Sequence, residues 1–226
     1  AGSDVGALRA KASRQADGSY LITGQKIFIT WGDHDLADNV IHLVLARLPD
    51  APAGTKGISM FLVPKVHVNA DGSLGEPNDV KCVSIEHKLG IHASPTCVMS
   101  FGDNGNCVGY IVGEENRGMA NMFTMMNHAR ISVGLEGVAI AERAYQHAAS
   151  YALERVQSAA IGAKTRDSVT IINHPDVRRM LLTMRATAEA SRAIIYRNVW
   201  ALDRAHALED AEARAAAKGE ADLLTP

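Results

Sequence analysis

Histidine and cysteine are the residues of this sequence most able to do chemistry, and neither type forms a recognisable site. The three cysteines, Cys82, Cys97 and Cys107, include no CxxC pair, and the nine histidines are scattered. No HExxH, GxGxxG or GxxxxGK[ST] motif occurs. We interpret the histidines as structural or surface residues. We interpret the cysteines as reduced thiols with no metal role, as is usual in the cytoplasm.

Composition and charge narrow the class of protein. The 226 residues are 47% hydrophobic and 21% charged, which is typical of a globular chain. The formal net charge of −2 provides no field that would hold a nucleic acid or an anionic membrane. No stretch of 18 apolar residues occurs, and the N-terminus has no apolar core of a signal peptide. The chain does not begin with Met, so we expect it to be a piece of a longer protein.

Glycine and proline divide the chain in two. Fourteen of the 19 glycines and five of the 7 prolines lie within residues 1–113. Because these residues mark turns, we expect residues 1–113 to form a β-domain and residues 114–226 to be helical. Alternating apolar segments in the first part predict five to seven strands, in an antiparallel barrel or sandwich. The predicted strands are residues 20–30, 39–46, 58–64, 80–85, 96–101 and 109–112.

Helical spacing of apolar residues predicts one helix over residues 117–157 and a second from Pro175 to about Ala207. A third helix is expected from Glu209 to Lys218, ended by Gly219. Gly134 and Gly137 each cost the first helix about 1 kcal/mol, so we expect a backbone or ligand to approach there. The predicted fold is α+β, an antiparallel β-barrel or sandwich followed by an incomplete four-helix bundle.

Seven local motifs follow one another in a characteristic order. They are Ala1-Gly2-Ser3-Asp4, GSYLITGQKIFIT (18–30), KGISMFLVPK (56–65), EHKLGIHASPTCVMSFGD (86–103), GEENRGM (113–119), the helix with Arg130, and YALERVQ (151–157). Together they resemble the acyl-CoA dehydrogenase family, over residues 1 to about 210, and most of all its branch of long bacterial members.

The resemblance implies a fold and an activity. The family has a middle β-domain and a C-terminal four-helix bundle with FAD between them. This chain therefore looks like the middle domain and the first part of the bundle. The full protein would oxidise acyl-CoA to trans-2-enoyl-CoA, as in fatty-acid β-oxidation, and pass electrons to a flavoprotein partner. By the same resemblance we expect a homo-oligomer.

The resemblance also assigns residues to FAD. Gly2 and Ser3 match the family's AGSD motif, whose Ser lies near both the flavin pyrophosphate and the acyl-CoA. Phe28, Ile29 and Thr30 match the family's W-I-T, where the aromatic ring packs on the flavin and the Thr bonds its edge. Phe28 replaces Trp, and Trp31 stands where Asn is usual. A turn serine and plain strand residues are the alternatives.

The helical segments carry the remaining assignments. Asn127 and Arg130 match F-D-x-x-R, whose Arg lies near CoA, although Asn127 replaces the Asp. Arg155 matches the Arg that reaches the FAD pyrophosphate across a subunit interface, and His174 matches a position near FAD. Surface ion pairing is the alternative for Arg130.

No catalytic residue is assigned within the chain. The family removes the α-proton of the thioester with a Glu, which in most members would lie beyond residue 226. In a few members it precedes the F-D-x-x-R Arg, and Ala129 stands there. We therefore expect residues 1–226 alone to be inactive and to bind FAD weakly or not at all. An acyl-CoA oxidase, a flavin monooxygenase and a non-catalytic binding or assembly protein of the same fold remain alternatives.

Overall fold

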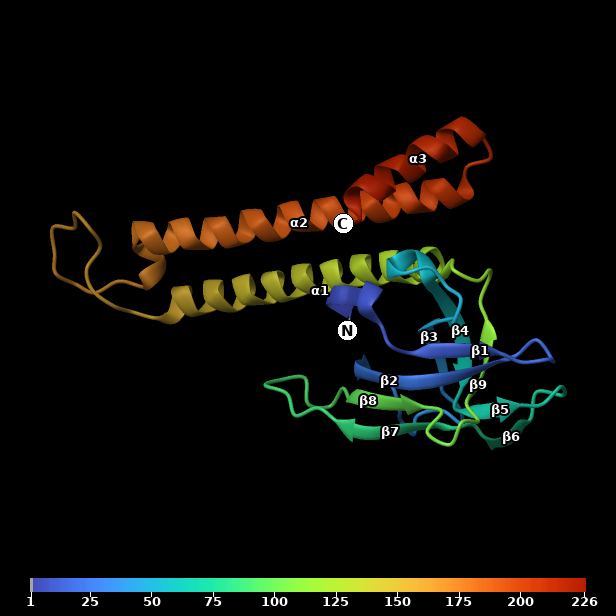
Figure 1. The fold of residues 1–226 in the computed structure, drawn as a ribbon. Coiled ribbons are helices and arrows are strands. Elements are labelled where there is room, and N and C mark those ends of the chain that lie inside the picture. The colour runs from blue at the N-terminus through green and yellow to red at the C-terminus, as the bar shows by residue number, and fades with distance from the viewer. Residues whose placement is uncertain (1) are drawn as a thin grey trace. The chain divides into compact units, whose positions relative to one another are not determined.

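The chain folds into two compact units, Ala1–Thr124 and Met125–Pro226 (Figure 1). The computed structural model describes residues 2–226, without the side chain of Ser3. The first unit contains the strands and the second contains helices, so the predicted α+β class is confirmed. No helix in the described residues has the length and apolar character needed to cross a membrane.

Seven strands of the first unit form one sheet, in the order β1-β3-β4-β9-β2-β8-β7. A further pairing of β1 with β2 closes five of these strands into a ring, so the sheet is a small barrel extended by β8 and β7. All neighbours are antiparallel except β1 and β3. The strands are β1 (Lys11–Arg14), β2 (Tyr20–Thr30), β3 (Ile41–Arg47), β4 (Ile58–Pro64), β7 (Val80–Ile85), β8 (Thr96–Phe101) and β9 (Val108–Ile111).

The period of two in these segments fills the barrel. Along β3 the inward residues His42, Val44 and Ala46 are buried, while the alternate residues Ile41 and Leu43 are exposed. Phe61 and Val63 of β4 and Ile22 of β2 are also fully or almost fully buried in this core. Burial of these side chains is the main force that holds the barrel closed.

The sequence did not predict β1, β5 (Val66–Val68) or β6 (Leu74–Pro77). β1 reads Lys-Ala-Ser-Arg and buries only Ala12, so it shows no apolar pattern. β5 and β6 pair only with each other, at the margin of the barrel. Short strands such as these depend on neighbouring strands rather than on their own propensity.

Three long helices follow: α1 (Gly118–Glu154), α2 (Pro175–Ala207) and α3 (Ala211–Leu224). The expected end of the third helix at Gly219 is wrong, because α3 continues through it. Asp210 caps its start by accepting a hydrogen bond from the Ala213 N–H at 2.7 Å. Ala217 and Ala221 on either side of Gly219 are buried, and this packing offsets the cost of a helical glycine.

The two glycines within α1 differ from the expectation. A Cβ atom added to Gly134 would lie 3.3 Å from Cδ1 of Ile195 in α2, so a side chain approaches there rather than a backbone. A Cβ atom on Gly137 would meet nothing within 4 Å. Only Gly134 therefore has a packing reason within the described residues.

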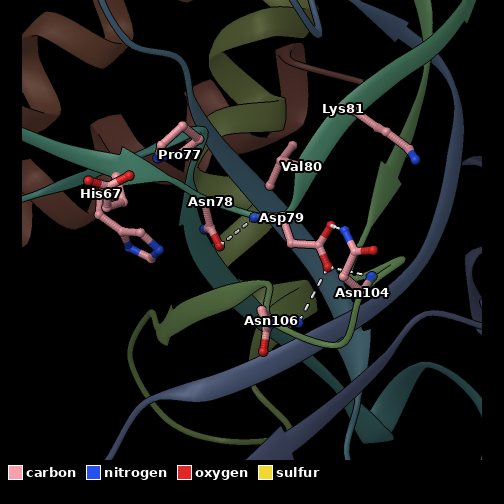
Figure 2. Close-up of a pocket in the computed structure, with 9 residues that line it drawn as sticks. His67, Pro77, Asn78, Asp79, Val80, Lys81, Asn104 and Asn106 are labelled. Atoms are coloured by element: carbon pink, nitrogen blue, oxygen red, sulfur yellow. Dashed lines mark hydrogen bonds between the residues drawn. The ribbon is translucent and has the colours of Figure 1, made fainter.

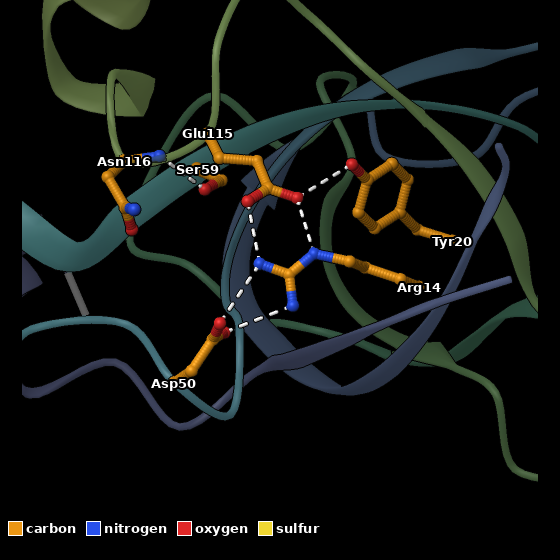
Figure 3. Close-up of polar contacts among 6 residues, drawn as sticks. All are labelled: Arg14, Tyr20, Asp50, Ser59, Glu115 and Asn116. Atoms are coloured by element: carbon orange, nitrogen blue, oxygen red, sulfur yellow. Dashed lines mark hydrogen bonds and ion pairs between the residues drawn. The ribbon is translucent and has the colours of Figure 1, made fainter.

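A polar joint leads from β9 into α1 (Figure 3). Glu115 accepts hydrogen bonds from Arg14 at 2.8 and 2.6 Å and from the Tyr20 hydroxyl at 2.9 Å. Asp50 accepts from the other side of the Arg14 guanidinium at 3.1 Å. Gly118 lies so close to β4 that an added Cβ would be 2.5 Å from the carbonyl carbon of Ser59. The first turn of α1 is thereby fixed to the barrel.

Candidate functional site

The predicted flavin segment lies in a β-bulge at the end of β2. Ile27 and Phe28 of β2 together oppose the single residue Val98 of β8, because the register shifts between Lys26 and Ile29. Phe28 occupies the bulge with a left-handed backbone, at φ 59°. Its ring is turned outward and the residue is 61% exposed. A bulge re-aims a side chain, and here it presents an aromatic ring at the surface of the barrel.

Thr30 ends the strand two residues later. It pairs with Thr96 of β8, and its side chain is exposed. Ile29 between them is half-buried and packs against the barrel core. The structure thus places an exposed ring and an exposed hydroxyl on either side of a residue anchored in the core.

Three bulky residues near this edge have left-handed backbones. Trp31 has φ 55° and Ile91, in the loop between β7 and β8, has φ 54°, close to the value at Phe28. Such conformations are uncommon for large side chains and persist only where neighbours enforce them. Both strand ends that flank the Ile91 loop belong to this edge, because Thr96 pairs with Thr30 and Ile85 with Cys97. Sequence reasoning did not single out Ile91, since no side-chain pattern signals its backbone angle.

The two residues expected near CoA lie together on α1. Nη1 of Arg130 donates a hydrogen bond to Oδ1 of Asn127 at 3.1 Å, one turn away. Asn127 thus accepts a hydrogen bond from Arg130 without the charge of the Asp that it replaces. Arg130 is exposed at the surface of α1.

Arg155 and His174 meet at Gln157 in the second unit. Nε2 of His174 lies 2.7 Å from the carbonyl oxygen of Gln157, and Nη2 of Arg155 lies 3.4 Å from its side-chain oxygen. The carbonyl of Arg155 also accepts from the Ile171 N–H, just before His174. The loop between α1 and α2 thus returns on itself and brings two cationic or protonatable side chains into one group.

Gly2 lies in a short 3₁₀ helix (Gly2–Ala7) and is exposed, with open space around its Cα. Open backbone of this kind leaves room for a phosphate to approach. The expected hydroxyl of Ser3 lies outside the described residues.

A polar pocket of about 430 Å³ lies elsewhere on the barrel (Figure 2). At its centre the carboxylate of Asp79 accepts hydrogen bonds from the backbone N–H of Asn104 at 2.7 Å and of Asn106 at 3.3 Å. Asp79 thereby ties the turn before β9 to β7. None of the residues predicted for cofactor or substrate lines this pocket, so we interpret it as the surface of a structural clamp.

A second cavity, of about 870 Å³, lies within the helical unit. Its walls come from α1 and α2 and include Tyr145, Pro175, Arg178 and Arg185. Ile172 and Pro175, on either side of His174 in sequence, line it, although neither His174 nor Arg155 does. Among the described residues no group of three or more His, Cys, Asp or Glu side chains is placed to hold a metal ion.

Two family models match the chain along nearly its whole length. Residues 1–104 match the acyl-CoA dehydrogenase middle domain, and residues 116–219 match the acyl-CoA dehydrogenase C-terminal domain. A 3-methylmercaptopropionyl-CoA dehydrogenase of Ruegeria pomeroyi is 54% identical over the full chain. The chain spans 38% of that relative's length.

Solved structures agree with this match. The butyryl-CoA dehydrogenase of Megasphaera elsdenii aligns with 99% of the chain and 52% of its own, at 27% identity and a TM-score of 0.69. An acyl-CoA dehydrogenase of Bacillus anthracis, complexed with FAD, aligns with 96% of the chain and 34% of its own, at 25% identity and a TM-score of 0.69.

Proposed function

Because the chain belongs to the acyl-CoA dehydrogenase family, we propose that it is the FAD- and acyl-CoA-binding part of an enzyme that oxidises acyl-CoA to trans-2-enoyl-CoA. The observation that carries this proposal is the bulge of β2, which exposes the Phe28 ring beside the Thr30 hydroxyl. The named activities of the similar proteins support the reaction class.

The residues at the bulge suit a flavin. A planar heteroaromatic ring needs a flat apolar surface on one side and hydrogen-bond donors at its polar edge. Phe28 provides such a surface and is too exposed to serve the core, while Thr30 provides the hydroxyl. When bound, FAD supplies the acceptor for the β-hydride of the substrate. We propose that Phe28 orients the ring and that Thr30 donates a hydrogen bond to its edge.

The helical unit would hold the phosphates. Arg155 and His174, grouped at Gln157 in the helical unit, are proposed to bind the FAD pyrophosphate. Gly2 and Ser3 of the first unit are proposed separately to give backbone and hydroxyl contacts to FAD, and Ser3 also to the acyl-CoA. Arg130, oriented by Asn127, is proposed to bind the CoA moiety. A guanidinium suits both tasks because its fixed fork of donors matches phosphate oxygens.

The proton of the substrate needs a base that these residues do not provide. Ala129, at the position used by a few family members, carries no proton acceptor. We propose that a Glu outside residues 1–226 removes the α-proton. We further propose that the full protein passes its electrons to a flavoprotein and that it is a homo-oligomer.

The test is anaerobic mixing of the purified full-length protein with a series of acyl-CoA thioesters. The proposal expects a yellow protein whose flavin absorbance is lost on mixing, with enoyl-CoA detected by mass spectrometry. A protein with flavin that no acyl-CoA reduces would contradict the dehydrogenase and favour a monooxygenase. A protein that binds neither FAD nor acyl-CoA would favour a non-catalytic role. Rapid reoxidation by O₂ would identify an oxidase.

A further inference from the structure

A buried histidine contacts the turn that follows the proposed flavin-binding residues Phe28 and Thr30. His42 lies on the inward side of β3, in line with Val44 and Ala46, and is 8% exposed. Its ring lies nearly perpendicular to the ring of Phe101 of β8, at 87°, with the two ring centroids 5.6 Å apart. An apolar side chain would fill this row as its neighbours do, so an imidazole here needs a reason beyond packing.

Both ring nitrogens of His42 face backbone carbonyl oxygens. Nε2 lies 2.7 Å from the oxygen of Gly32, and Nδ1 lies 3.3 Å from the oxygen of Val63. A carbonyl oxygen only accepts hydrogen bonds, so the shorter contact requires a proton on Nε2. His42 therefore donates to Gly32, the second residue after the strand that carries Phe28 and Thr30.

Gly32 is closely packed against β8 and is hydrogen-bonded within its own turn. A Cβ atom on Gly32 would lie 2.9 Å from the sulfur of Met99 and 3.1 Å from Cβ of Cys97. Its N–H donates to the carbonyl of Ile29 at 3.3 Å, which closes the turn. Without His42, the Gly32 carbonyl would be a buried acceptor with its side-chain donor removed, and the turn would shift to reach another donor.

The turn also fixes the backbone of Trp31, a strained residue beside the proposed site. The Trp31 N–H donates to the carbonyl of Pro95 at 2.8 Å, which fixes Trp31 with its left-handed backbone. Asp33, the next residue after Gly32, forms an ion pair with Lys65. Asp33 is thus already paired, and His42 is the side chain that donates to the Gly32 carbonyl.

We propose that His42 is a positioning residue, whose hydrogen bond to Gly32 fixes the turn at residues 29–33 and thereby aims Thr30 and Phe28 at the flavin. The orientation of Thr30 and Phe28 toward a flavin rests on the proposed function, whereas the hydrogen bond that fixes the turn does not. His42 touches neither cofactor nor substrate and acts through the backbone. It should therefore change how the flavin is held more than whether the barrel folds.

The test compares three variants of the full-length protein. His42→Phe keeps a ring against Phe101 and removes the donor, and His42→Asn shortens the side chain so that it no longer reaches Gly32. His42→Gln restores a donor of similar reach. Val44→Ala, two residues along the same inward row, is the matched control, because it removes packing and no hydrogen bond.

Amide hydrogen exchange of the apoprotein reads the turn directly. In His42→Phe and His42→Asn, the Trp31 and Gly32 amides should exchange about tenfold faster, since losing one buried hydrogen bond costs about this factor. His42→Gln should return to within about threefold of the wild type. Val44→Ala should lower the melting temperature without a selective change at these two amides. Unchanged exchange in both donor-free variants would overturn the hold on the turn.

The flavin gives the second readout. With FAD bound, the donor-free variants should shift the visible absorbance band and lower the rate constant for reduction at saturating acyl-CoA, and His42→Gln should restore both. An unchanged band and rate despite faster exchange would overturn the positioning role. A wild-type protein that binds no FAD would instead defeat the proposed function, while the exchange result would still stand.

Discussion

Thr30 and Phe28 show how a single residue's backbone decides what its side chain can do. Phe28 stays at φ 59° because β8 offers one residue opposite two of β2. A left-handed backbone costs a residue with a large side chain about 1 kcal/mol or more, so the pairing of β2 with β8 must stabilise it. The result is a ring and a hydroxyl that face outward from a core strand. We expect substitutions here to affect chemistry more than stability.

Replacing Thr30 by Val tests this directly. In the full-length enzyme, Thr30→Val should slow flavin reduction by acyl-CoA about a hundredfold, because a donor aimed at developing charge acts mainly in the transition state. Valine keeps the β-branched shape, so the strand should persist. Rapid-mixing absorbance at saturating acyl-CoA measures the rate.

Thr23→Val is the matched control, since Thr23 is exposed on the same strand at its other end. It should leave reduction unchanged. If Thr30→Val reduces its flavin at the wild-type rate with normal FAD content, then Thr30 is only a strand residue and the assignment fails.

At the scale of elements, the joint between β9 and α1 determines where a 37-residue helix starts. Hydrogen bonds from Arg14 lower the pKa of Glu115, and the same guanidinium lowers the pKa of Asp50. Folded pKa values below the unfolded ones mean that this stabilisation is present above about pH 4.5 and is lost as the pH falls through the folded values. The joint should therefore weaken in acid.

Glu115→Gln should lower the melting temperature near neutral pH and make its decline between about pH 5 and pH 3 less steep, because the amide does not titrate. Thermal unfolding across this pH range is the measurement. Glu114→Gln, at the exposed neighbouring position, serves as the control and should follow the wild-type curve. Parallel curves for Glu115→Gln and the wild type would show that the joint does not contribute to acid sensitivity.

In a second element, α3, Gly219 lowers the stability of the helix, and a substitution can remove this effect. A Cβ atom there would meet nothing within 4 Å, and the residue lies in the helix interior. Gly219→Ala should raise the free energy of unfolding by about 1 kcal/mol. Denaturant unfolding followed by circular dichroism measures it. Gly134→Ala should gain less, because Ile195 already lies at 3.3 Å, and an equal gain at both sites would contradict the packing argument.

The elements also show how far a sequence of this kind predicts its fold. Strands with strong apolar runs, such as residues 58–64, 80–85 and 96–101, were predicted at the observed bounds. β1 was missed because its pairing with β2 and β3 sustains it rather than its own residues. The third helix passes Gly219 because burial of neighbouring alanines outweighs a local signal. Pattern reasoning succeeds where local preference and tertiary packing agree.

The residues of the candidate site were predicted from family resemblance rather than from local sequence patterns. Family resemblance pointed to Phe28, Arg130 and Arg155, which composition and spacing alone would have left among surface residues. The bulge at Phe28 and the turn held by His42 were not predicted, because neither a φ angle nor a hydrogen bond between strands is visible in the residue types. His42 did carry one signal, since strand alternation places it in the same inward row as Val44.

For the whole molecule, the helical unit leaves large apolar side chains exposed. Val133, Ile140 and Leu182 are 63%, 68% and 68% exposed. Exposed apolar side chains are usually covered by other protein surface where they form a contiguous patch. The chain spans 38% of the length of its relative from Ruegeria pomeroyi.

We expect the full-length protein to be a homodimer or a dimer of dimers, with Arg155 reaching FAD across the interface. Light scattering at micromolar concentration should give a mass of two or four chains. Arg155→Ala should lower the FAD content of the assembly, while Arg166→Ala, in the exposed loop that follows, should not. A monomer with its full complement of FAD would contradict the prediction.

The place of β9 in the ring has a consequence for synthesis. β9 joins β4 to β2, so the barrel closes only when residues 108–111 are available. The nascent chain completes β4 at Pro64 and reaches the end of β9 at Ile111, 47 residues later. At about 5–20 residues per second, two unpaired strand edges stay open for about 2–9 s. During that time the growing chain exposes strand edges of the kind that pair with other chains.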